Sequence, residues 1–418
     1  RPTWMTDPAA RCLSAVTLVG CWNGDKAGDR ACLEAIFDGC YAQLEAQLRH
    51  MLSINDSPVL QIGAIWKAKA PLELLYLFAG KITATELQAF FKLAEAVLSK
   101  PDPSLDLETD KRWAAAIYGK VREESGLVIN SILDSLVKLR VYAEGSVDGH
   151  ADLIMSSVDN LVRNLLRDAD AQRWLSLSSN LRELAEASPD VFLGELERSL
   201  DGNDAPVLSL LTETESSTSF GRAWHTDLLR ALEVLAWYPA RLTRIADILS
   251  RLVTVPINGN WGNTPKNTLI SLFRPWWPQT TATAEQRVAS IDRLLRTRNT
   301  VAWNLLSSLT GRFGFATANA SPRWRDDDAG APSANDATDF GWYASEIGAR
   351  LLKYAEDYPD RIAKLTDDID RFAGDYRSRL AELIEQGVKF DDEGRELIRA
   401  SLRKHLNWHN SFNRDGTK

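Results

Sequence analysis

The sequence is poor in the residues from which metal centres and disulfide frameworks are commonly built. Its 418 residues include five histidines and four cysteines, and no two cysteines have the CxxC spacing of a zinc ligand pair. Cys32 and Cys40 fall in step with apolar residues at intervals of four, which predicts that both lie on one helix. We expect buried, reduced thiols in a cytoplasmic protein, with a metal or disulfide cluster as the alternative. The four cysteines are Cys12, Cys21, Cys32 and Cys40.

Long hydrophobic runs are also missing. No stretch approaches 18 uninterrupted apolar residues, so we expect no membrane-spanning helix and no membrane partner. The chain opens on Arg-Pro-Thr-Trp, with neither a signal-peptide pattern nor an initiator methionine, and we expect it to be a fragment of a longer protein. With 44% apolar and 25% charged residues, the composition excludes a disordered chain and fits a folded protein.

Sequence motifs for nucleotide binding and nucleophilic catalysis are absent. Gly80-Lys81 and Gly119-Lys120 are followed by Ile and Val, where a P-loop requires Ser or Thr. No G-x-S-x-G elbow or G-x-G-x-x-G fingerprint occurs. His405 and His409 stand four apart, but Leu406 takes the position of the general-base Glu of an H-E-x-x-H enzyme. We therefore predict that this chain is not an enzyme, with no catalytic residues, no metal ligands and no cofactor.

Two acidic runs keep an enzymatic alternative open. Asp367, Asp368 and Asp370 form the first run, and residues 326–328 form the second. Paired acidic motifs on facing helices can hold a divalent metal, so a metal-dependent helical hydrolase or lyase is the alternative function. Each run is also explained by a solvated helix face or loop, because no second motif pairs convincingly with either.

The dominant pattern along the chain is helical. Apolar residues between 84 and 99 form a stripe with a 3.6-residue period, and Thr83 and Glu86 have the spacing of a capping box just before it. Similar stripes occupy 228–235 and 242–252. The run 59–66 is the one moderate candidate for a strand.

Prolines divide these helices into pairs. Ser188-Pro189, Tyr238-Pro239 and Tyr358-Pro359 each lie between two helical stretches. Proline disfavours helix at the preceding residue but fits the first turn of a new helix, so each junction predicts two adjacent antiparallel helices. Repeated pairs predict an all-α fold, an irregular α-solenoid of HEAT/TPR-like antiparallel pairs. A compact helical bundle is the structural alternative.

Stretches rich in Gly, Asn, Ser and Pro interrupt the helical pattern. We predict long loops near 254–266 and 312–341. The predicted organisation is an N-terminal helical segment (1–105), a helical-repeat region carrying a Trp/Arg-rich patch (106–335) and a C-terminal helical segment (336–418).

The charge of residues 261–325 differs from that of the rest of the chain. This stretch holds nine basic and two acidic residues, a net charge of +7 in a chain whose total is −8. It also contains five of the fourteen tryptophans. Arg and Trp are the residues most enriched at protein-binding hot spots. We predict a partner-binding surface formed by Arg274, Trp276, Trp277, Arg287, Arg323, Trp324 and Arg325.

Two other interpretations of the basic stretch stay open. The tryptophans can pack between repeats while the arginines pair with acidic neighbours. Basic residues interleaved with aromatic ones can also bind single-stranded nucleic acid, so a nucleic-acid-binding adaptor is a further alternative, less favoured than a protein ligand.

Several Trp- and Pro-containing phrases together resemble a known family. They include Leu232–Trp237 followed by Pro239, then Ser271–Thr280 with Arg287, and Arg323–Arg325. Trp66 before Pro71, Ala94–Leu98, and Trp174 leading to Leu184–Pro189 complete the set. The combination resembles the C-terminal helical-repeat region of bacterial STAND-type antiviral NTPases, the Avs-like defence proteins.

The resemblance implies a sensor module. In such proteins an effector and a P-loop ATPase precede a C-terminal superhelix that grips a phage protein, and recognition promotes oligomerisation and switches on the effector. The resemblance therefore implies a viral protein ligand, and partner effector or NTPase domains in the same or an associated chain. This chain departs from the full family pattern because it contains neither a P-loop nor an effector signature, and no contact residues carry over.

Overall fold

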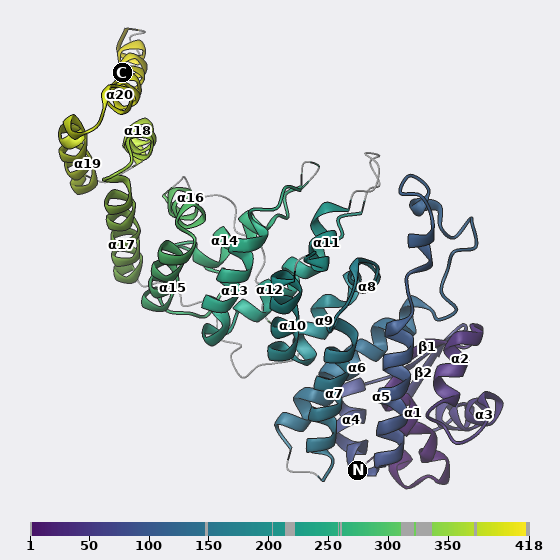
Figure 1. Cartoon of the computed structure of the whole chain (residues 1–418). Coiled ribbons are helices and arrows are strands. Elements are labelled where there is room, and N and C mark those ends of the chain that lie inside the picture. Colours follow the sequence, from purple (N-terminus) through teal and green to yellow (C-terminus); the bar gives the residue numbers. More distant parts are fainter. Residues whose placement is uncertain are drawn as a thin grey trace. The chain divides into compact units, whose positions relative to one another are not determined.

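The computed structural model is predominantly helical, which confirms the all-α class predicted from the sequence (Figure 1). It describes residues 2–146, 149–202, 204–213, 222–257, 259, 261–310, 322, 337–371 and 374–414. Within these residues, no helix combines the length and apolar character needed to cross a bilayer.

The chain divides into two compact units. Unit 1 comprises Arg1–Leu235, Val255–Trp261 and Pro322–Asp327, and unit 2 comprises Ala236–Thr254, Gly262–Ser321 and Asp328–Lys418. The boundary near residue 236 falls inside the predicted central region 106–335. The three-part division at 105 and 335 stays a prediction.

Unit 1 combines helices with one small sheet. α1 contacts α4, α5 and α6, α5 contacts α6, and α6 also contacts α7 and α9. The helices are α1 (Leu13–Val19), α2 (Ala27–Glu34), α3 (Tyr41–Leu52), α4 (Pro71–Phe78), α5 (Ala84–Ser99), α6 (Gly126–Glu144), α7 (Ala151–Leu166), α8 (Ala171–Leu177), α9 (Leu181–Ala187), α10 (Pro189–Asp201), α11 (Ser209–Thr212) and α12 (Thr226–Ala236).

The sheet contains three antiparallel strands in the order β1-β3-β2. The extended structure predicted at 59–66 is confirmed, but it is a hairpin of two strands, β2 (Val59–Ile62) and β3 (Ile65–Ala68). β1 (Cys21–Asn23) was not predicted. Trp22 pairs with Trp66 across β1 and β3, and their rings stack with centroids 6.3 Å apart. Buried aromatic pairs of this kind add to the stability of a small sheet.

Unit 2 is built from helices that contact their near neighbours along the chain. α13 contacts α14 and α15, α15 contacts α16 and α17, α17 contacts α18 and α19, and α18 contacts α20. This order is typical of stacked helix pairs. The helices are α13 (Pro239–Leu252), α14 (Pro265–Phe273), α15 (Ala284–Thr297), α16 (Asn299–Leu309), α17 (Ala337–Ala355), α18 (Pro359–Asp367), α19 (Gly374–Gln386) and α20 (Asp392–Arg414).

Local sequence signals placed several helix starts correctly. Pro189, Pro239 and Pro359 each occupy the first position of a helix, as predicted. Thr83 and Glu86 form the predicted capping box: the Glu86 carboxylate accepts from Thr83 N at 2.7 Å, and Glu86 N donates to the Thr83 hydroxyl at 3.2 Å. Such reciprocal bonds satisfy amide groups that the first turn of α5 leaves open.

The cysteine prediction was partly wrong. The four cysteines are free thiols, but Cys32 lies on α2 whereas exposed Cys40 precedes α3, so they do not share a helix. The chain leaves the helix after Glu34 and turns through Gly39 before α3 begins. Of the predicted loops, residues 254–264 are non-helical where described, and most of 312–341 lies outside the described residues.

Candidate protein-binding surfaces

The predicted surface centres on the segment that follows α14 in unit 2. Arg274 is the residue directly after α14, and Trp276 and Trp277 follow it. Arg274 and Trp276 are half-buried, while 39% of Trp277 is exposed. The segment therefore offers aromatic surface to a partner chiefly through Trp277.

The segment begins directly at the end of α14, and hydrogen bonds fix the chain again just after Trp277. Gln279 N donates to Ser271 O of α14 at 3.0 Å. Thr281 donates through its amide, at 3.0 Å, and its hydroxyl, at 2.9 Å, to the carbonyl of Trp237. A loop tied down at both ends presents Trp277 with little loss of conformational freedom on binding.

The prediction that Arg287 contributes to a binding surface is wrong. The residue is fully buried on α15, and its guanidinium lies over the ring of Tyr343 at 4.1 Å. Its Nη1 donates to Arg274 O at 2.9 Å. A side chain without exposed surface cannot meet a partner, so Arg287 positions the Arg274–Trp277 segment from within unit 2.

The remaining predicted residues divide into two groups. Arg323, Trp324 and Arg325 lie outside the described residues. Elsewhere in the basic stretch, Trp303 is buried on α16 under the Arg361 guanidinium, which lies 4.9 Å from its ring centre. The packing interpretation therefore holds for Trp303.

A second, more exposed apolar surface lies in unit 1 and was not predicted. It is the segment 103–122 between α5 and α6, which extends away from the helices of its unit (Figure 1, blue). Trp113 is 69% exposed, Ile117 80%, Tyr118 54% and Val121 55%. We call these four residues the apolar cluster. Large apolar side chains gathered within nine residues at such exposure are typical of interaction sites.

Ion pairs hold the segment that carries the apolar cluster. Arg112 donates to Glu213 at 2.7 Å and to the carbonyl of Leu107 at 3.2 Å. Lys120 pairs with Asp106 at 2.8 Å across the segment. The apolar cluster is therefore exposed on a segment whose conformation is held by ion pairs and hydrogen bonds.

The base of the segment is joined to two helices. Asp102 N donates to Ser176 of α8 at 2.9 Å, and Arg122 Nη2 donates to Lys100 O after α5 at 2.9 Å. Lys100 in turn pairs with the buried carboxylate of Glu124, and this hydrogen bond raises the pKa of Lys100. Both ends of the segment are therefore fixed to the rest of unit 1.

The charges around the apolar cluster nearly cancel. Residues 103–124 contain four basic and five acidic side chains. An apolar centre inside a mixed-charge rim is the composition of protein interfaces, whereas nucleic acid and anionic lipid surfaces select a positive excess.

The acidic run 367–370 is engaged in ion pairs of unit 2. Asp367 pairs with Lys404 at 3.0 Å, and Asp370 lies 3.9 Å from Nδ1 of His405. The side chain of His409 and the run 326–328 lie outside the described residues. Among the side chains that the structure describes, no group of three or more His, Cys, Asp or Glu is placed to hold a metal ion.

Comparisons with known proteins returned nothing to which this chain is similar: no protein-family model matches it, and neither does any curated protein or solved structure.

Proposed function

We propose that the chain is a non-catalytic recognition module that binds a protein ligand, acting as the sensor part of a bacterial antiphage defence protein in the cytoplasm. Ligand binding would be coupled to effector or NTPase domains outside this chain. The observation that carries the proposal is the apolar cluster, since four large apolar side chains are held at high exposure by ion pairs within their own unit.

The helical architecture supports the same function. The neighbour-to-neighbour contacts of the unit 2 helices suit an α-solenoid, in which each pair packs on the next and a continuous surface is left for a partner. Trp277 supplies a second exposed anchor on a tied loop of that unit. Tryptophan is one of the residues most enriched at the hot spots of protein interfaces.

The partner class is argued from charge. Binding to nucleic acid draws most of its free energy from phosphates, whereas residues 103–124, which include the apolar cluster, carry four basic and five acidic side chains and so have no positive excess. A protein with a complementary apolar pocket matches this surface. The nucleic-acid alternative is favoured by the basic stretch 261–325, of which residues 261–310 and 322 are described.

Site-specific photocrosslinking tests the proposal. A photoreactive phenylalanine analogue at Ile117 is expected to capture one protein in phage-infected bacteria, and the same analogue at Ile62 is the matched control. Ile62 is also an apolar residue of unit 1, 62% exposed on the β2–β3 hairpin. A protein captured equally at both positions would argue against the apolar cluster.

Reconstitution with the captured protein completes the test. The double variant Trp113→Ser, Ile117→Ser is expected to raise the Kd roughly a hundredfold or more, the loss of two anchor residues. Ile62→Ser should leave the Kd unchanged. Unchanged binding by the double variant would refute the proposal, and nucleic acid with steeply salt-dependent affinity in the crosslinked product would favour the adaptor alternative.

A further inference from the structure

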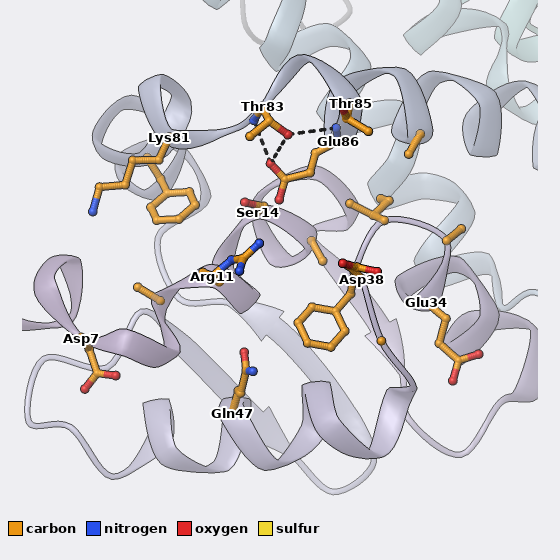
Figure 2. A pocket seen from close by; sticks show the side chains of 18 of the residues that line it. Asp7, Arg11, Ser14, Glu34, Asp38, Gln47, Lys81, Thr83, Thr85 and Glu86 are labelled. Atoms are coloured by element: carbon orange, nitrogen blue, oxygen red, sulfur yellow. Dashed lines mark hydrogen bonds between the residues drawn. The ribbon is translucent and has the colours of Figure 1, made fainter.

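Unit 1 contains a cavity that the protein-binding proposal does not use. It has a volume of about 910 Å³ and is lined by segments far apart in the sequence. They include the two short 3₁₀ helices Thr3–Thr6 and Pro8–Cys12, the start of α1, the turn between α2 and α3, α3, the end of α4 and the start of α5 (Figure 2). The volume lies within the range of sites for small organic ligands.

Most charged groups around the cavity already have partners in the protein. The Asp7 carboxylate binds His50 at 2.9 Å and Ala9 N at 2.8 Å, and these bonds lower its pKa. Lys81 donates to Met5 O at 2.5 Å, and Glu34 accepts from Tyr41 N at 2.7 Å. Figure 2 shows the Lys81 and Glu34 side chains pointing away from the centre. These bonds shape the wall and leave it preformed.

Several polar side chains line the cavity with no protein partner among the described residues, and three of them supply a cation, an anion and a buried amide oxygen. Arg11 extends into the middle of the cavity, and Asp38 lies on another wall, on the turn after α2 (Figure 2). The Gln47 side chain points from α3 toward Arg11, and its buried Oε1 accepts no hydrogen bond. A buried acceptor without a donor loses free energy unless a bound group supplies one.

The rest of the wall mixes polar and apolar side chains. Ile36, Phe37 and Phe78 line the cavity, together with the small side chain of Ala10. The unpartnered groups of the wall thus include one cation, one anion and one buried uncharged acceptor, with apolar surface beside them. A purely anionic ligand would place negative charge beside Asp38, and a purely cationic one would place positive charge beside Arg11.

We propose that this cavity binds a zwitterionic molecule of the short-peptide class. Its carboxylate accepts hydrogen bonds from the Arg11 guanidinium, and its ammonium group donates to Asp38 and to Gln47 Oε1. Apolar side chains of the ligand contact Phe37 and Phe78. The inference is independent of the apolar cluster, because the cavity and the cluster share no residue.

Peptides with blocked ends test the charge assignment. The probes are Ala-Phe and Ala-Leu-Phe, each also prepared with an acetylated amino end or an amidated carboxyl end, and calorimetry measures the Kd. Each block removes one charge and is expected to raise the Kd of the wild-type chain roughly tenfold, the effect of one charge-assisted hydrogen bond.

Two variants assign each end of the peptide to its side chain. Arg11→Gln should raise the Kd of the unblocked peptide. In this variant amidation should no longer change the Kd, whereas acetylation should still raise it. Asp38→Asn should also raise the Kd of the unblocked peptide, but here acetylation should no longer change the Kd, whereas amidation should still raise it. Arg30→Gln and Asp25→Asn are matched controls, because both residues are exposed and neither lines the cavity; they should bind as the wild type does.

Three results would overturn the proposal. The first is a Kd above roughly 10 mM for every probe with the wild-type chain, weaker than any specific small-ligand site would give. The second is an equal effect of both blocks in both variants, which would mean that the peptide ends do not contact Arg11 and Asp38. The third is a coupling between Arg11 and Asp38 in a double-mutant cycle of stability without peptide, which would show that they pair with each other.

Discussion

The guanidinium of Arg287 lies 4.1 Å from the ring centre of Tyr343, and both side chains are fully buried in unit 2. Each also bonds the chain where α14 ends: Tyr343 donates its hydroxyl to Phe273 O at 2.9 Å, and Arg287 donates to Arg274 O at 2.9 Å. Burial raises the pKa of Tyr343 far above its usual value, so its hydroxyl stays protonated and remains a donor. The pair joins α15 and α17 to the Arg274–Trp277 segment.

Arg287→Ala is therefore expected to destabilise unit 2 by roughly 2–4 kcal/mol, because it leaves a cavity and removes the donor to Arg274 O. Arg293→Ala on the same helix is the matched control, since Arg293 is exposed. Chemical unfolding followed by circular dichroism measures the difference. Equal stability of the two variants would contradict the positioning role of Arg287.

Asp29 has a comparable role in unit 1. Its fully buried carboxylate accepts from Asn23 N at 2.8 Å, from Ser125 N at 2.6 Å and from the Ser125 hydroxyl at 2.5 Å, which links β1 and the start of α6. Asp29→Ala leaves two half-buried amides without their acceptor and is expected to cost roughly 2–4 kcal/mol of stability. Asp25→Ala changes an exposed carboxylate nearby and should stay within roughly 0.5 kcal/mol of the wild type. A smaller loss in Asp29→Ala than in Asp25→Ala would be inconsistent with this network.

Sequence reasoning succeeded where the cause of a structure is local. Pro189, Pro239 and Pro359 begin helices because the proline ring suits the first turn, whatever the rest of the chain does. Thr83 and Glu86 make their capping box because both partners lie within one turn. The class of the fold follows from many such signals and was predicted correctly.

Sequence reasoning failed where contacts between residues far apart in the chain decide the structure. Arg287 looks like surface chemistry in a basic stretch, but its burial depends on Tyr343, which follows it by more than fifty positions. The three residues of β1 form a strand only because β3 supplies the partner Trp66. Trp113 and Ile117 stand four apart as on a buried helix face, and only the surrounding structure leaves them exposed.

The apolar cluster should contribute little to folding. Trp113→Ser and Ile117→Ser remove side chains that are more than two-thirds exposed, so each is expected to change the free energy of unfolding by less than roughly 0.5 kcal/mol. Trp66→Ser, in the buried stack with Trp22, should instead cost roughly 3–5 kcal/mol. A large loss on replacing Trp113 would mean that the cluster is structural, and chemical denaturation distinguishes the two cases.

The cysteines should differ in reactivity. Burial raises the pKa of Cys12 and of Cys32 to about 12, so both are protonated thiols at neutral pH and shielded from reagents. Cys40 is exposed and should be alkylated first. Iodoacetamide labelling followed by mass spectrometry measures the order. Modification of Cys12 in the folded protein at the rate of Cys40 would contradict the burial of Cys12 at the end of the 3₁₀ helix Pro8–Cys12.

The same two thiols should make stability fall at alkaline pH. A thiol in the unfolded chain loses its proton near pH 9, whereas Cys12 and Cys32 keep theirs in the folded state up to about pH 12. The unfolded state therefore binds fewer protons between these limits, and each thiol lowers the free energy of unfolding by up to about 1.4 kcal/mol per pH unit.

Urea denaturation under reducing conditions should show the wild type losing stability relative to the double variant Cys12→Ala, Cys32→Ala as pH rises from 8 to roughly 10.5. Cys40→Ala is the control and should follow the wild type. Parallel profiles for the wild type and the double variant would mean that the two thiols do not have raised pKa values in the folded chain.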